Sequence, residues 1–305
     1  MSKYDSDDQQ IPVRQTALIN HYSKINMLKN HCRFCRNIIS LFVVIIASGC
    51  STLPPDSDEI KNVNNEATEK ITYTRDELLG RATVERNLGN YAKAIEILAP
   101  IAESGDAIAQ FILGNIFDVD TSNNEHEAIK WYRKSAKQGL AEAQNALGVM
   151  YAIGNGVTRD DKIAVNWYLK AAEQGYAEAQ FNLGSRYERG LGVDQDYATA
   201  RAWYAKAVSS NHPKSIHNLA ILYVAGRGGE KDTALAMELF LKAAKFGSPD
   251  SHYEIGVLYN KGIGVPKDQQ IAAQWFLSGA KLGSAHAQVA LGNLFWYGEG
   301  LEKNL

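Results

Sequence analysis

The sequence predicts an all-α solenoid, in which a series of helical hairpins stack on one another. The first observation behind this prediction is an internal repeat, because glycines recur every 36 residues in three registers. The second is that each repeat holds two stretches with apolar residues at helical spacing. A period between about 20 and 50 residues is typical of a solenoid, whose units bury their apolar faces only against their neighbours.

The three glycine registers extend from residue 148 to residue 300. The first contains Gly148, Gly184, Gly256 and Gly292, with Ala220 in the remaining place. The second contains Gly154, Gly190, Gly226, Gly262 and Gly298, and the third contains Gly156, Gly192, Gly228, Gly264 and Gly300. The second and third registers predict the connection between two helices, since glycine adopts positive φ without a steric penalty.

Each repeat is expected to form two amphipathic helices, as residues 143–175 illustrate. The first stretch places Ala143, Leu147, Met150 and Tyr151 on one helical face. The second places Ala164, Trp167, Tyr168, Ala171 and Ala172 at positions i, i+3, i+4, i+7 and i+8. Both spacings match the 3.6-residue period of an α-helix with one buried face.

Capping residues predict where these helices begin and end. The expected N-caps of the second helices are Asn124, Asp160, Asp196, Asp232 and Asp268. The expected left-handed residues after those helices are Gly139, Gly175, Asn211, Gly247 and Gly283. Pro213 and Pro249 lie at the start of a first helix, where the missing N–H has little effect.

Residues 143–175 resemble the repeat of the Sel one-like repeat (SLR) family, helical-hairpin relatives of tetratricopeptide repeats. They follow its pattern A-x-x-x-L-G-x-x-Y-x-x-G-x-G-V-x-x-D-x-x-x-A-x-x-W-Y-x-K-A-A-x-x-G at nearly every position. Five copies are identified over residues 107–283, with local departures such as Phe117 for Tyr and Leu239 for Trp. The resemblance implies a right-handed α/α superhelical solenoid of hairpins with repeats of about 36 residues.

Residues 1–49 are expected to contain a signal peptide. From Met27 the chain shows a basic segment, an apolar run over residues 38–47 and the small-residue sequence Ala47-Ser48-Gly49-Cys50. This resembles a bacterial lipoprotein signal, which implies cleavage before Cys50 and lipid on its thiol. Translation is expected to start at Met27, since that start gives a signal of ordinary length. The alternative is that Cys50 is an ordinary residue after an uncleaved anchor.

Residues 50–72 are rich in Pro, Ser, Asp, Asn and Glu and predict a flexible tether. Removing residues 1–49 takes away more basic than acidic side chains, which argues against electrostatic attachment to anionic lipid. Ser51 after the cysteine resembles lipoproteins of the outer membrane that face the periplasm. The resemblance thus implies a lipid-anchored protein of the bacterial cell envelope.

The two ends of the repeat array are expected to differ. Residues 73–106 predict a capping hairpin similar to a tetratricopeptide repeat, because only Gly89-Asn90 separates its helices. Residues 284–305 predict an incomplete sixth repeat, whose terminal surface includes Trp296 and Tyr297. Since a solenoid end needs a polar cap, we expect a partner or a second copy to cover this surface. A truncated gene is the alternative.

The sequence contains no recognisable set of catalytic, metal-binding or cofactor-binding residues. Glycines such as those at Gly226-Arg227-Gly228-Gly229 follow a helix, whereas a dinucleotide-binding loop follows a strand. The histidines after residue 50 form no H-x-x-x-H pair, no G-x-S-x-G motif occurs, and Cys32 and Cys35 lie in the segment expected to be removed. A formal net charge of −2 gives no reason to expect nucleic acid as a partner. We therefore expect a protein that is not an enzyme.

Partner-binding residues are expected where the repeats differ along the first helices, on the concave surface if the resemblance holds. The candidates are Phe181, Arg189, His217, Tyr253, Lys261, Trp296 and Tyr297. Rigid aromatic side chains beside a cation are typical of binding hot spots. The alternative is that the aromatic ones pack between adjacent first helices. The column Trp131, Trp167, Trp203 and Trp275 is expected in the core, and the column Lys134, Lys170, Lys206 and Lys242 on a solvated face.

The predicted function is a protein-interaction scaffold of the cell envelope, acting in assembly, secretion or envelope processes. One alternative is a surface-exposed virulence-type factor that binds a host protein. Another is a hydrolase of cell-wall or β-lactam substrates, an activity attributed to some cysteine-rich relatives. The chain after residue 50 has no further cysteine, which separates it from those relatives.

Overall fold

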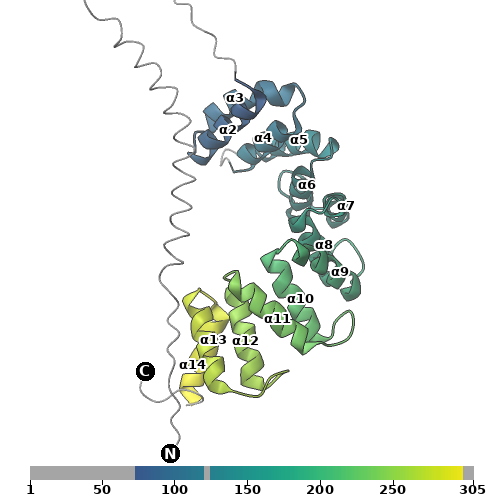
Figure 1. The fold of residues 1–305 in the computed structure, drawn as a ribbon. Helices are drawn as coiled ribbons and strands as arrows, with labels where there is room; N and C mark the ends of the chain where they lie inside the picture. Colours follow the sequence, from purple (N-terminus) through teal and green to yellow (C-terminus); the bar gives the residue numbers. More distant parts are fainter. Residues whose placement is uncertain (1–72, 120–123, 298–305) are drawn as a thin grey trace, which may run out of the picture. The chain divides into compact units, whose positions relative to one another are not determined.

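A computed structural model of the chain describes residues 73–119 and 124–297, which form helices joined by short connections (Figure 1). The expected signal peptide, Cys50 and the tether lie outside the described residues. Within these ranges every regular element is an α-helix. No helix among them has both the length and the apolar character needed to cross a bilayer.

The described helices alternate between first and second helices of successive hairpins, and each is 13 residues long. The first helices are α2 (Arg75–Asn87), α4 (Ala107–Val119), α6 (Ala141–Ile153), α8 (Ala177–Arg189), α10 (Pro213–Ala225), α12 (Pro249–Lys261) and α14 (Ala285–Tyr297). The second helices are α3 (Tyr91–Glu103), α5 (Glu125–Lys137), α7 (Asp161–Glu173), α9 (Tyr197–Ser209), α11 (Thr233–Lys245) and α13 (Gln269–Lys281). Each helix packs chiefly against the helices before and after it, so the predicted helical repeat solenoid is confirmed.

The predicted helix caps are confirmed. The Asp232 carboxylate accepts the Leu235 N–H at 2.9 Å, and the aspartates at the same position before α7, α9 and α13 accept equivalent bonds. Asn124 occupies the N-cap of α5 without a side-chain cap bond. Asn211 adopts φ 58°, the left-handed conformation that glycine supplies in the other repeats.

A buried aromatic ring on each of the second helices α5 to α13 explains the first glycine register. These rings are Tyr132, Tyr168, Tyr204, Phe240 and Phe276. A Cβ on Gly148 would stand 2.5 Å from the Tyr168 ring, and the glycines facing Tyr132, Tyr204 and Phe276 have the same relationship. Glycine leaves room for the next ring in these four first helices, whereas α10 carries Ala220 in the cluster that contains Phe240.

The third glycine register connects consecutive repeats. A Cβ on Gly192 would collide with the backbone of Asp161, the first residue of α7 in the preceding repeat. Gly228 has the same relationship with Tyr197 at the start of α9. The connection inside one hairpin therefore lies directly against the beginning of the preceding second helix.

The tryptophan column was expected in the core, and the structure buries one of its members fully and three in part. Trp131 is buried in the cluster formed with α2, α3 and α4, while Trp167, Trp203 and Trp275 are half-buried against neighbouring clusters. In three repeats the lysine three residues later lies over the indole, at 3.9, 4.4 and 3.8 Å from Nζ to the ring centroid. These three exposed lysines, Lys134, Lys170 and Lys206, therefore also cover the outer faces of the rings, while Lys242 is half-buried.

Candidate functional site

The predicted aromatic stripe occupies the fifth position of three first helices. Phe181, His217 and Tyr253 are half-buried on α8, α10 and α12. Each contacts the buried ring of the next second helix, with centroids 5.8 Å apart for Phe181 and Tyr204, 5.6 Å for His217 and Phe240, and 5.8 Å for Tyr253 and Phe276. The stripe therefore combines packing against the core with a partly open outer edge.

The same side chains also reach the adjacent first helix. Phe181 contacts the His212 ring at 5.1 Å, and His217 Nδ1 lies 2.9 Å from the Ser251 hydroxyl of α12. Burial lowers the pKa of His217 below its ordinary value. Tyr253 contacts the His286 ring of α14 at 5.5 Å. These contacts fix the orientation of each ring from two sides.

Tyr253 and Lys261 come together at a pocket of about 280 Å³ between α12, α13 and α14. Its lining residues are Tyr253, Val257, Asn260, Lys261, Phe276, Ala290, Asn293 and Leu294. The pocket therefore combines apolar walls with two amides, a phenol and one ammonium group. Glu254, half-buried on α12, has a pKa raised by burial, and its charge interacts with Lys261.

Of the remaining predicted residues, Arg189 and Trp296 do not line this pocket. Arg189 is exposed at the last position of α8. Trp296 is 85% exposed near the end of α14, and Val289 and Phe295 of the same helix are exposed as well. Tyr297 ends α14, and its side chain lies outside the described part of the chain. A Cβ on Gly292 of α14 would meet no described atom within 4 Å, unlike those of the equivalent glycines.

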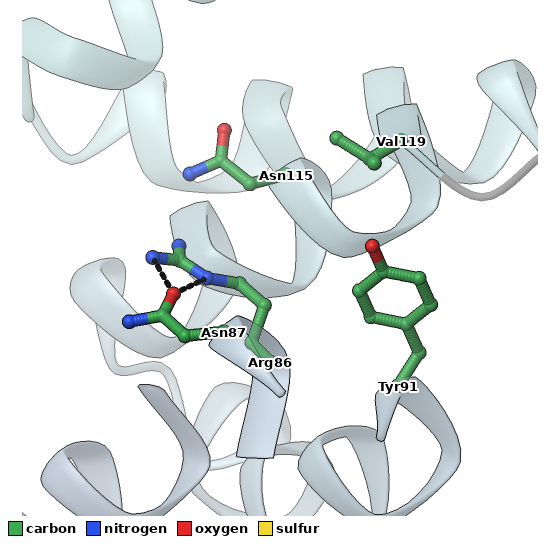
Figure 2. Close-up of a pocket in the computed structure, with 5 residues that line it drawn as sticks. All are labelled: Arg86, Asn87, Tyr91, Asn115 and Val119. Atoms are coloured by element: carbon green, nitrogen blue, oxygen red, sulfur yellow. Dashed lines mark hydrogen bonds between the residues drawn. The ribbon is translucent and has the colours of Figure 1, made fainter. Parts of the chain in front are cut away.

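Sequence reasoning missed a second pocket, of about 360 Å³, between α2, α3 and α4. Figure 2 shows Arg86 and Asn87 on one side and Tyr91 on the other, with Asn115 and Val119 facing them from α4. Arg86 and Asn87 belong to the N-terminal hairpin, outside the 36-residue repeat, so no column of aligned positions marked them. One signal for this pocket was available in the sequence. The first helix α2 ends in a basic residue next to an asparagine, as α12 does at Asn260 and Lys261.

Comparison with known proteins identifies six repeats in this chain. The Sel1 repeat family matches residues 107–140, 141–176, 177–212, 213–247, 249–284 and 285–305. Comparison with curated proteins gives no match.

Two solved structures are similar to the chain. One is c5321, a protective antigen present in uropathogenic Escherichia coli strains displaying an SLR fold, with 34% identity over 69% of this chain and a TM-score of 0.65. The chain covers only 45% of that protein. The other is a Sel1 repeat protein from Oxalobacter formigenes, with 34% identity over 65% of this chain and 79% of that protein, at a TM-score of 0.57.

These matches agree with the hairpins seen in the structure. The described helices pair in the same order as the matched repeats, from α4 with α5 to α12 with α13. The Sel1 repeat fold is generally a non-catalytic scaffold for protein interactions. Because six consecutive segments match over most of its length, the chain belongs to the Sel1 repeat family.

Proposed function

We propose that the chain is a non-enzymatic protein-interaction scaffold of the bacterial cell envelope and that it binds a protein partner at the pocket between α12 and α14. The observation that carries this proposal is that Tyr253 and Lys261, selected from the repeat pattern, line one pocket together. Pockets with apolar walls and a few polar groups are the usual places for recognition.

The composition of the pocket supports binding of a protein side chain. Tyr253 is held between the rings of Phe276 and His286, so little conformational entropy remains to be lost when a partner contacts it. Lys261 is exposed at the rim, where its ammonium group is available to an acidic partner. An oriented aromatic ring next to a cation is the composition of an interface hot spot.

In this proposal the interface with the partner extends from the pocket along the first helices. Phe181 and His217 present their partly open edges on α8 and α10, and Arg189 is exposed at the end of α8. On the other side of the pocket, α14 exposes Val289, Phe295 and Trp296. Apolar side chains exposed together on one helix favour contact with a partner or with a second copy of the chain.

The partner proposal is tested by cross-linking and co-purification from envelope membranes. The wild-type chain is compared with Lys261→Glu, which reverses the charge at the rim, and with Lys245→Glu, a matched change at the exposed last position of α11. We expect one partner to be recovered with the wild type and Lys245→Glu and lost with Lys261→Glu. Recovery of the same proteins by all three chains contradicts a binding role for the pocket.

Attachment to the membrane is proposed to occur through lipid on Cys50, with residues 50–72 as tether and the solenoid facing the periplasm from the outer membrane. The order of basic residues, apolar run and Ala47-Ser48-Gly49-Cys50 supports this proposal. Incorporation of labelled palmitate into the wild type, and its loss in Cys50→Ala, is the expected result. Equal labelling of both chains overturns it.

A surface-exposed location is the second candidate, and one observation favours it. The similar E. coli structure is described as a protective antigen, and an antigen that protects must be accessible to antibody. Antibody labelling of intact cells distinguishes the two locations, because a periplasmic protein is labelled only after the outer membrane is opened. Labelling of intact cells would favour a host protein as partner.

A further inference from the structure

We propose that the pocket formed by Arg86, Asn87, Tyr91 and Asn115 binds a peptide carboxylate. The pocket lies between α2, α3 and α4 and shares no residue with the pocket between α12 and α14. The inference therefore adds a second binding site to the scaffold and assigns the chemistry of its ligand.

The side-chain oxygen of Asn87 already accepts hydrogen bonds from its neighbour in the chain. Arg86 donates to the Asn87 side-chain oxygen from both Nε and Nη2, at 3.4 and 3.2 Å (Figure 2). This pair of bonds holds the guanidinium beside the amide and occupies the amide oxygen. The Asn87 NH₂ group makes no hydrogen bond within the described residues, and guanidinium N–H groups remain for a ligand.

The side-chain oxygen of Asn115 is also occupied by a hydrogen bond. Its side-chain oxygen accepts the Tyr132 hydroxyl proton at 2.8 Å. Burial raises the pKa of Tyr132 further above its ordinary value, so this hydroxyl remains a donor at every physiological pH. The amide is thereby fixed with its oxygen toward the core, and its NH₂ group donates to no atom of residues 73–119 or 124–297. Within these ranges both asparagines of the pocket have occupied oxygens and N–H groups that remain for a ligand.

Tyr91 and Val119 complete the lining of the pocket. Tyr91 is half-buried at the start of α3, and its hydroxyl has no hydrogen-bond partner in the described part of the chain. Val119 supplies an apolar wall. The pocket therefore presents a guanidinium, two amide NH₂ groups and a phenol to its ligand. An ionised carboxylate has only acceptors, and arginine binds it with two parallel bonds, so the two sets are complementary.

A comparison of the junctions between first helices supports this chemistry. The pocket uses the last two residues of α2 and the ninth residue of α4, and the pocket at α12 uses the same three places, Asn260, Lys261 and Asn293. Both pockets therefore combine one cation with two asparagines. The four described junctions between them carry other sets: Asp118, Val119 and Val149; Ala152, Ile153 and Ser185; Glu188, Arg189 and Ile221; and Val224, Ala225 and Val257.

The negative charge of Asp118 repels an anion bound in this pocket. Asp118 accepts a bond from Asn155 at 3.2 Å, and its Oδ2 lies 3.4 Å from the Tyr132 hydroxyl oxygen, which places it beside Asn115. Its negative charge weakens binding of a carboxylate without blocking the donors. Asp118→Asn is therefore expected to bind the ligand several-fold more tightly than the wild type.

The volume of about 360 Å³ fits one or two residues of a peptide and excludes a whole helix. The carboxylate belongs either to the end of a chain or to an aspartate or glutamate side chain. Three acetylated probes of otherwise identical Gly-Ser-Leu sequence separate these sources. One ends in a free carboxylate, one ends in an amide, and one ends in an amide but contains a glutamate.

The test follows the side-chain NH₂ resonances of Asn87 and Asn115 in the full-length, isotope-labelled protein during titration with each probe. We expect these resonances to shift with one or both carboxylate probes and to remain in place with the neutral amide. A response to the free-acid probe assigns a chain end, and a response to the glutamate probe assigns an acidic side chain. Equal responses to all three probes, or no response at either asparagine, overturn the proposal.

Three variants accompany the titration. Arg86→Gln and the isosteric Asn87→Asp are expected to weaken binding at least about tenfold, since each removes a donor that faces the charge. Arg81→Gln, a matched change at an exposed position of α2 that does not line the pocket, is the control and is expected to bind as the wild type does. Unchanged affinity in both pocket variants, with unchanged melting temperature, contradicts the site. Because Lys261 is intact in these variants, the result is independent of the pocket between α12 and α14.

Discussion

At the scale of single residues, Gly148 shows how the lack of a side chain lets two helices pack closely. The Tyr168 ring occupies the space beside its Cα, and the ring itself is 2% exposed. Replacing this glycine forces the ring out of a close-packed site, and overpacking of this kind is destabilising. The contact recurs in most repeats, so it is a common element of the fold rather than a local feature.

We expect Gly148→Ala to lower the free energy of unfolding by about 1–3 kcal/mol through this overpacking. Gly80→Ala is the control, because Gly80 is helical in α2 and a Cβ there meets nothing within 4 Å. The control is expected to raise stability by about 0.5–1 kcal/mol, since alanine has the higher helix propensity. Urea denaturation of both variants gives the comparison, and equal stability of the two would contradict the packing argument.

His217 gives a prediction about pH. Its pKa is below its ordinary 6.5 because the imidazole is buried against Phe240 and Ser251, and the charge of Asp250 opposes this shift without reversing it. Between the folded and unfolded pKa values the unfolded chain binds the proton and the folded chain does not. The contribution of His217 to stability is therefore complete above pH 6.5 and is lost as pH falls through the folded pKa.

Denaturation at pH 7.5 and pH 5 measures this effect. We expect His217→Gln to lose less stability on acidification than the wild type, because the titrating group is gone. His126→Gln, an exposed substitution on α5, is expected to keep the wild-type pH dependence. An identical loss in all three proteins would exclude His217 as the source.

Sequence reasoning reached some of these residues and not others, for physical reasons. Caps and glycines are local, so Asp232 and Asn211 were predicted from their own neighbourhoods. The contact of Phe181 with Tyr204 depends on how two helices from one hairpin cross, and no local pattern specifies that. Arg86 was missed because its hairpin falls outside the period that aligned the other positions.

At the scale of elements, the second helices α7, α9, α11 and α13 begin where an aspartate side chain accepts one or two of the first free N–H groups. Asp232 bonds to the Leu235 N–H before α11, while Glu230 in the same connection has no cap bond. We expect Asp232→Ala to destabilise the protein by about 1 kcal/mol and Glu230→Ala to have almost no effect. Thermal denaturation of the two variants, which remove the same charge, measures the cap alone. Equal melting temperatures would contradict it.

The helices themselves were largely predictable because their apolar spacing, caps and terminating glycines agree with one another. The pockets were less predictable at this scale. A pocket needs the ends of two first helices to leave space between them, and that depends on side-chain volumes in both helices. Val149 and Val257 are the ninth residues of their helices, as Asn115 is, but of these three positions only Asn115 shares a pocket with a basic residue of the preceding first helix.

At the scale of the whole molecule, the described chain has five hydrophobic clusters in place of a single core. Each cluster joins consecutive helices, and Trp131 connects α5 to the cluster of α2, α3 and α4. Stability in such an array is approximately a sum of terms from repeats and their neighbours. The period in the sequence predicted this organisation, because a repeated pattern can bury its faces only between copies.

We therefore expect Trp131→Ala to cost about 3–5 kcal/mol and to act locally. Hydrogen exchange should become faster for the amides of α2 to α5 while those of α10 to α13 stay protected. Trp296→Ala, at a side chain that is 85% exposed, is the matched control and should leave exchange unchanged. Uniformly faster exchange after Trp131→Ala would mean that the array unfolds as one unit.

The contact of a first-helix glycine with the next aromatic ring also affects how a gene for this protein can change length. Recombination that removes residues 177–212 would place α10 after α7, and the new neighbours would meet through the same kinds of surface as the old ones. Whole repeats can thus be gained or lost without a new interface having to evolve. Because the two asparagine-lined pockets lie outside such an exchanged segment, the copy number would change how many repeats separate them while each pocket kept its chemistry.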